Sequence, residues 1–105
     1  VLPGVGALSD HAFSRWNELK EQHRTIGDVR GLGLMIGIDL VKEGNTPDPD
    51  AFKPIARHAF EAGMFILNCG PDWNIIRFIP PLNVSMDDLD RGIDILAEGV
   101  ARYEA

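Results

Sequence analysis

The segment from Val29 to Val41, VRGLGLMIGIDLV, constrains the fold most, because large aliphatic and small residues alternate along it. The even-numbered positions are all large and aliphatic: Leu32, Leu34, Ile36, Ile38 and Leu40. The odd-numbered positions are Gly31, Gly33, Met35, Gly37 and Asp39. Side chains alternate between the two faces of a strand, so this pattern predicts one strand, or two strands with a bend at the glycines, with one face in a core. The other face is nearly bare, and we expect a neighbouring segment to pack closely against it.

Helical spacing precedes and follows this segment. Ser9 is a predicted N-cap, and four residues after it form one stripe of an amphipathic helix that ends near Gly27: Ala12, Trp16, Leu19 and His23. After a loop rich in Gly, Asn, Pro and Asp, Pro54 suits the first turn of a second helix, and Gly63 is its expected C′ residue. The apolar stripe of this helix comprises Phe52, Ile55, Ala56, Ala59 and Phe60.

A hairpin and a third helix complete the pattern. MFIL (64–67) and IIRFI (75–79) are predicted strands joined by the turn NCGPDWN, and Pro80 and Pro81 should end the second strand. Ser85 with Asp88 resembles a capping box, with Val84 and Leu89 as a hydrophobic staple. The apolar face of the last helix is predicted to carry Leu89, Ile93, Leu96 and Val100. The order helix, strand or strand pair, helix, hairpin, helix predicts a single α+β domain over residues 1–105, a small, mainly antiparallel sheet with helices on one face.

Composition narrows the class of protein. A formal charge of −6 has the wrong sign for binding nucleic-acid phosphates or an anionic bilayer, and no apolar run approaches the roughly 20 residues of a membrane span. Cys69 is the only cysteine, which fits a reducing cytoplasm. The chain begins at Val1 in an irregular leader, so we expect it to be a piece of something longer.

Several apparent motifs do not carry chemistry. The third glycine of GLGLMIG falls one place late for a dinucleotide fingerprint, and no helix follows to hold a pyrophosphate. Metal binding is not expected, because no spacing places two of the histidines on one ion; solvated or capping roles are predicted for His11, His23 and His58. Acid-base chemistry is not expected of the carboxylates Asp87, Asp88, Asp90 and Asp94, because Asp87 and Asp88 lie in the first turn of the predicted helix, where the helix dipole favours negative charge. Cys69 is expected to be structural, and no catalytic residue is assigned.

Arg77 is the most informative candidate, because it lies between Ile75 and Ile79 on one face of an apolar strand. A charge in this position needs a partner. One reading is a structural ion pair with one of the chain's many carboxylates. The other is a bidentate clamp on the carboxylate of a ligand, for which a planar guanidinium is well suited.

Three segments, DVRGLGLMIGIDLV, AFEAGMFILNCGP and NIIRFIPPLNVSMDDLDRGIDIL, together resemble the C-terminal small domain of class III aminotransferases. The segment LNCGPDWNIIR is particularly similar to bacterial 4-aminobutyrate aminotransferases. The resemblance implies a pyridoxal-phosphate enzyme of fold type I in which Arg77 binds the carboxylate of a 2-oxoacid or amino-acid substrate. Arg30 also matches the family, and we read it as structural.

The same resemblance implies that the cofactor lysine and the phosphate-binding loop belong to a large domain outside this chain. Lys20, Lys42 and Lys53 lie in helical or loop settings that do not suit a Schiff base. We therefore expect this chain to bind no pyridoxal phosphate and to be inactive alone. Its implied partners are the large domain and a second subunit of a homodimer, and its implied reaction is a ping-pong transfer of an amino group to a 2-oxoacid such as 2-oxoglutarate.

Two alternatives remain open. Class III relatives include amino-acid racemases, which would keep the fold and change the reaction. A free-standing module that senses amino acids is the other alternative, although such folds usually alternate β-α-β-β-α-β, whereas this chain is predicted to begin and end with helices.

Overall fold

The computed structural model describes residues 5–33, 35–64, 66–79 and 84–105. Its elements are α1 (Val5–Gln22), β1 (Ile26–Leu32), β2 (Met35–Lys42), η1 (Glu43–Asn45), β3 (Thr46–Pro47), η2 (Pro49–Ala51), α2 (Phe52–Glu61), β4 (Leu67–Cys69), β5 (Ile75–Phe78) and α3 (Met86–Glu104). This is the predicted α+β order. The alternating segment around Gly31 and Gly33, for which either one strand or two was expected, forms two strands.

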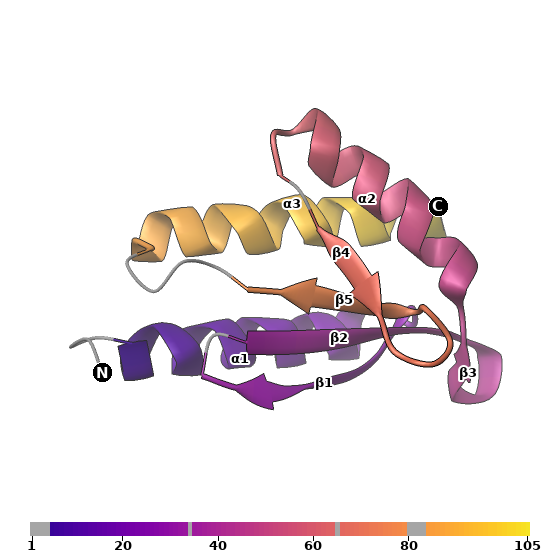
Figure 1. Ribbon diagram of the computed structural model, residues 1–105, viewed down its shortest axis with the longest axis horizontal. Helices are drawn as coiled ribbons and strands as arrows, with labels where there is room; N and C mark the ends of the chain where they lie inside the picture. Colours follow the sequence, from indigo (N-terminus) through magenta and orange to yellow (C-terminus); the bar gives the residue numbers. More distant parts are fainter. Residues whose placement is uncertain (1–4, 34, 65, 80–83) are drawn as a thin grey trace.

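The sheet has the strand order β1–β2–β5–β4, and the short strand β3 pairs with β2 (Figure 1). All the described strand pairs are antiparallel, as predicted. The central pairing joins β2 to β5, which places Gly37 opposite Arg77. Gly37 is also the partner of Arg30 in β1, so one row of the sheet runs Arg30, Gly37, Arg77.

The helices cover one face of this sheet. Figure 1 shows α1 and α3 behind the strands, with α2 packed beside α3. The core between these layers contains the predicted apolar residues of both layers, including Ala12, Trp16, Ile36, Ile38, Leu40, Ile55, Ile76, Phe78, Ile93 and Leu96. Trp16 of α1 meets Phe78 of β5 edge to face, with ring centroids 5.7 Å apart. None of the described helices has the length and apolar character that a membrane span requires.

The opposite face of the sheet, the open face, carries large apolar side chains that are half exposed or more. Met35 is 59% exposed, Leu67 52% and Ile79 51%. The first two lie on the same face as Arg77, because Leu67 is the cross-strand partner of Arg77 and Met35 is two residues from Gly37. These exposed side chains leave the face open among the described residues, so the expectation that a neighbouring segment packs against it stays a prediction.

The last helix begins as predicted. The Ser85 hydroxyl accepts a hydrogen bond of 3.1 Å from the Asp88 N–H, and the apolar face of α3 is buried. Gly63, the predicted C′ residue of α2, has φ 88°, and the next residue, Met64, donates its N–H to the carbonyl of Ala59 at 2.8 Å.

Other boundaries differ from the prediction. Ser9 is no N-cap: α1 begins at Val5, and the Ser9 hydroxyl donates a 2.8 Å hydrogen bond to the carbonyl of Gly33. Phe60, placed in the buried stripe of α2, is 69% exposed because it lies on the outer side of that helix. The strand predicted at 64–67 begins at Leu67 instead, and Phe65 is outside the described residues, as are Pro80 and Pro81.

Candidate functional site

Arg77 is an exposed residue in the third position of β5, with its neighbours Ile76 and Phe78 buried in the core. The alternation of the strand therefore turns Arg77 toward the open face. Within the part of the chain that the structure describes, no carboxylate lies within 4.0 Å of its guanidinium nitrogens. The ion-pair reading of Arg77 thus has no partner among these residues.

A hollow of about 360 Å³ lies on the open face beside Arg77, and we call it the sheet hollow. Its lining residues are Arg30, Gly31, Met35, Ile36, Gly37, Cys69, Ile75, Arg77 and Ile79. Gly37 forms the floor between the two arginines, because it is the cross-strand partner of both and has no side chain. The hollow therefore combines an apolar wall with two guanidinium groups.

The two arginines differ in their charge balance. Arg30 Nη1 lies 2.8 Å from Asp39 Oδ2 and 3.3 Å from Asp28 Oδ2. The hydrogen bond to Asp39 is the main reason that the pKa of Arg30 is raised above its ordinary value. Arg30 is thus held by carboxylates of its own sheet, in agreement with the structural role expected for it. Of the two guanidinium groups that line the sheet hollow, that of Arg77 is therefore the one that can bind a ligand.

A second hollow, of about 520 Å³, borders Arg77 from the helix side, and we call it the helix hollow. It lies between the end of α2, β5 and the first turns of α3. Met64, Phe78 and Leu89 contribute apolar lining, and Asp88 and Arg91 contribute charge. A carboxylate could therefore reach Arg77 from either of two sides.

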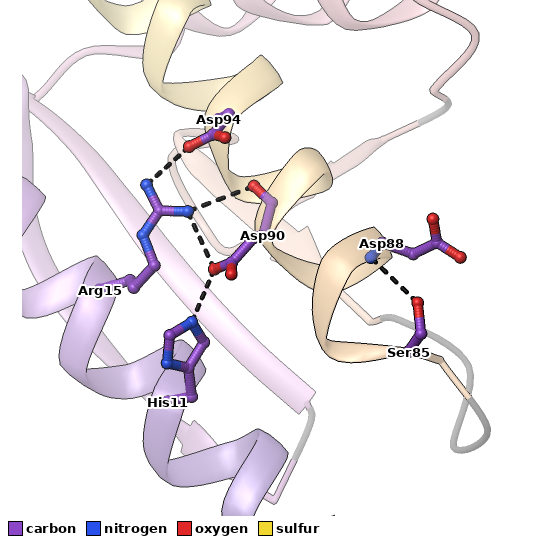
Figure 2. A network of polar contacts seen from close by, with 6 residues as sticks. All are labelled: His11, Arg15, Ser85, Asp88, Asp90 and Asp94. Carbon is purple, nitrogen blue, oxygen red and sulfur yellow. Dashed lines mark hydrogen bonds and ion pairs between the residues drawn. The ribbon is translucent and has the colours of Figure 1, made fainter.

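The histidines pair with carboxylates, so the prediction that they are solvated or act as caps is wrong in this respect. In Figure 2, His11 Nε2 lies 2.6 Å from Asp90 Oδ1, and Arg15 reaches Asp90 at 3.1 Å and Asp94 at 2.7 Å. The hydrogen bond from His11, and then that from Arg15, lowers the pKa of Asp90. His58 similarly lies 3.2 Å from Glu98. The first network joins α1 to α3, with a structural role.

A third pairing involves a residue that the sequence reasoning did not single out. Glu104, at the end of α3, accepts hydrogen bonds from the Thr25 N–H at 2.9 Å and the Thr25 hydroxyl at 2.6 Å. Its other oxygen lies 2.8 Å from His23 Nδ1. Burial alone would raise the pKa of Glu104, but the hydrogen bonds from Thr25 and His23 outweigh it, and the pKa is lowered. Nothing local in the sequence connects residues 81 positions apart.

The remaining candidates lie at the start of α3 and in β4. Asp87 and Asp88 occupy the first turn of α3, as expected from the helix dipole. Cys69 is half-buried in β4 and lines the sheet hollow. Among the residues with a described placement, no group of three His, Cys, Asp or Glu side chains could hold a metal ion.

The lysines do not form a setting for pyridoxal phosphate within this chain. Lys20 is exposed and lies 3.8 Å from Asp28, and Lys53 is exposed on α2. Lys42 borders a separate hollow beside η1, with Arg24 and Glu43. The described lining of the two hollows at Arg77 contains no lysine. The residues that the structure describes therefore do not fit the cofactor by themselves.

Comparison with known proteins places this arrangement in a family. Residues 2–100 match the family model described as aminotransferase class-III. The chain is 37% identical over 100 residues to an alanine/serine racemase of Pyrococcus horikoshii, covering 95% of this chain and 21% of that protein. It is 46% identical over 80 residues to a 4-aminobutyrate aminotransferase of Mycobacterium leprae, covering 75% of this chain and 18% of that protein.

The fold is also found in solved structures. A phospholyase from Arthrobacter, solved in complex with phosphoethanolamine, superposes with a TM-score of 0.88 at 26% identity, over 92% of this chain and 24% of that one. The chain thus spans about a fifth of the length of these relatives. The family match and the identities to its members lead to one conclusion: the chain belongs to the class-III aminotransferases, a family that depends on pyridoxal phosphate.

Proposed function

We propose that residues 1–105 form the C-terminal small domain of a longer cytoplasmic aminotransferase, in which Arg77 binds the carboxylate of the substrate. The observation that carries this proposal is the contrast between two arginines in one hollow. Arg30 is held by Asp28 and Asp39, whereas Arg77 is exposed and has no carboxylate partner in the described chain. A planar guanidinium in this state can donate two parallel hydrogen bonds to one carboxylate.

The large domain is the proposed partner of this chain, together with a second copy of the enzyme in a homodimer. Pyridoxal phosphate, bound by the large domain, would supply the electron sink that allows an amino group to be transferred. The residues described here would supply binding and orientation, with Arg77 fixing the carboxylate end of the substrate. Two charge-assisted hydrogen bonds, each of about 1.5–3 kcal/mol, are sufficient for this positioning role.

For the substrates, we propose an omega-amino acid such as 4-aminobutyrate as donor and a 2-oxoacid such as 2-oxoglutarate as acceptor. The 46% identity to the Mycobacterium leprae 4-aminobutyrate aminotransferase supports this choice. The second candidate is amino-acid racemisation, which the 37% identity to the Pyrococcus horikoshii racemase favours. The two reactions are distinguished by incubating the complete enzyme with one enantiomer of an amino acid and no 2-oxoacid. Loss of optical rotation with sustained turnover indicates a racemase.

The test of the carboxylate site is Arg77→Lys in the complete enzyme. Lysine keeps the charge and loses the planar fork, so the loss should be about 2–4 kcal/mol in transition-state binding, or roughly 30- to 1,000-fold in kcat/KM for 2-oxoglutarate. The loss should be much smaller for an aldehyde acceptor without a carboxylate. Cofactor absorbance and Tm should stay close to those of the wild type.

Arg57→Lys is a matched control, because Arg57 is exposed on α2 and borders neither hollow at Arg77. It should leave kcat/KM unchanged for both acceptors. Equal losses for the 2-oxoacid and the aldehyde in Arg77→Lys, together with a lowered Tm, would instead indicate that Arg77 has a structural role.

A further inference from the structure

Gly37 occupies the centre of the sheet hollow, in the row that runs from Arg30 through Gly37 to Arg77. Neighbouring strands lie roughly 4.8 Å apart, so the two arginine stems flank the glycine at about that distance on either side. A side chain at this position would stand between them. The missing side chain is what opens the space that the hollow occupies.

The backbone does not require glycine at this position. A Cβ added to Gly37 would lie 3.4 Å from Ile75 Cγ2 and 3.8 Å from the Arg30 carbonyl oxygen, which are ordinary contacts, and φ is outside the left-handed region. Gly31 is different: its φ is 151° and an added Cβ would lie 1.9 Å from the Met35 carbonyl oxygen. The backbone conformation therefore requires glycine at position 31. At position 37 the fold would accept a side chain, so the space beside Gly37 is not explained by the backbone.

The surroundings of this space indicate which ligand would fit. Met35, Ile75 and Ile79 provide apolar surface for an aliphatic chain. The charge of Arg30 is already compensated by Asp39 at 2.8 Å and Asp28 at 3.3 Å. Among the described lining residues, only Arg77 is then left with a guanidinium that can bind an anion. The hollow therefore suits one carboxylate at the end of an aliphatic chain.

We propose that Gly37 is a specificity-determining residue: the substrate reaches Arg77 from the sheet hollow, with the chain next to its carboxylate lying over Gly37. This inference rests on the proposed function of Arg77 and adds the direction of approach and the position that controls it. It excludes approach through the helix hollow, which Gly92 of α3 lines.

The experiment compares Gly37→Ala with Gly92→Ala in the complete enzyme. The two substitutions are matched, because a Cβ added to Gly92 would also meet only ordinary contacts, 3.6 Å from Met64 Cε and 3.6 Å from Phe78 Cε1. We expect Gly37→Ala to raise KM for 2-oxoglutarate by about tenfold or more, the usual effect of one misplaced methyl group in a substrate pocket. Turnover of an aldehyde acceptor should not change, and Gly92→Ala should behave as wild type toward both.

A second measurement does not depend on turnover. Phenylglyoxal modifies accessible arginines, and mass spectrometry reports the extent of modification at Arg77. Butyrate should protect Arg77 from modification in the wild type and in Gly92→Ala, and protect it poorly in Gly37→Ala. This readout gives an answer even if Gly37→Ala weakens folding of the sheet, since protection is compared with and without butyrate in the same variant.

The outcomes separate the two proposals. A rise in KM for Gly92→Ala, with none for Gly37→Ala, overturns the inference in favour of the helix hollow. If neither glycine variant changes KM or protection while Arg77→Lys still impairs the 2-oxoacid reaction, the role of Gly37 is wrong and the role of Arg77 stands. If Arg77→Lys also lacks a selective effect, the proposed function itself fails.

Discussion

At the scale of single residues, Ser85 shows how one side chain sets the start of a helix. Its hydroxyl accepts a hydrogen bond from the Asp88 N–H, one of the amide groups that the first turn of α3 leaves without a helical partner. Ser85→Ala should therefore lower the free energy of unfolding by about 1 kcal/mol. Urea denaturation of the two proteins measures this difference.

Ser14→Ala is the control for this substitution, because Ser14 is exposed within α1 and alanine favours helix at least as much as serine. Its unfolding free energy should stay within about 0.5 kcal/mol of the wild type. A similar loss in both variants would show that the hydroxyl of Ser85 does not act as a cap.

The same side-chain type also shows the limit of local prediction. Ser85 and Ser9 both precede an amphipathic pattern, and both were predicted N-caps. Ser85 is one because its partner lies three residues away, within the local sequence. Ser9 instead bonds the carbonyl of Gly33, 24 residues away, and the helix starts earlier. A local pattern cannot weigh a tertiary hydrogen bond against a cap.

At the scale of elements, α3 is tied through Glu104 to the turn between α1 and β1. Its folded-state pKa is lowered, so this carboxylate holds its proton less readily in the folded state than in the unfolded one. The stability that it contributes is fully present above the ordinary glutamate pKa, about 4.3, and is lost as the pH falls through the lower folded value.

Glu104→Gln should consequently lower the free energy of unfolding at pH 7 by on the order of 1–3 kcal/mol, as expected for a charged hydrogen-bond acceptor. The difference from the wild type should shrink as the pH is lowered from about 5 toward 3. Urea denaturation across this range measures it, with Glu61→Gln, at an exposed position of α2, as the reference. A difference that does not depend on pH would contradict the role assigned to the carboxylate.

The sequence predicted which helices and strands form, but it did not predict which strands pair with each other. The alternation around Ile36, Ile38 and Leu40 predicted strands with one buried face, because burial of that face depends on a local period of two. The pairing of β2 with β5, which brings Gly37 beside Arg77, joins segments about 40 residues apart in the chain. Arg77 could be named in advance, but its hollow depends on this long-range pairing.

At the scale of the whole molecule, the open face of the sheet exposes large apolar side chains to water. Met35, Leu67 and Ile79 are each more than half exposed there, and β4 lies at the edge of the sheet. An edge strand with exposed apolar side chains favours pairing with another chain. We therefore expect residues 1–105, produced alone, to self-associate in a concentration-dependent manner, as measured by sedimentation velocity.

Leu67→Lys should reduce this association, because a lysine on the edge strand places a charge on the open face. Phe60→Lys is the matched control: Phe60 is 69% exposed and belongs to α2, a helix on the covered side of the sheet. A monomeric wild-type chain at high concentration would refute the expectation. Equal effects of the two lysine substitutions would place the contact elsewhere.

The polar contacts between α1 and α3 also bear on the order of events during synthesis. His11 and Asp90 are 79 residues apart in the chain, and His23 and Glu104 are 81 residues apart. While the ribosome is still producing the strands, α1 has been made, but the carboxylates that pair with His11 and His23 have not. The first pairing must wait until residue 90 has left the ribosome and the second until residue 104 has, so these polar contacts form only after every described strand has been made.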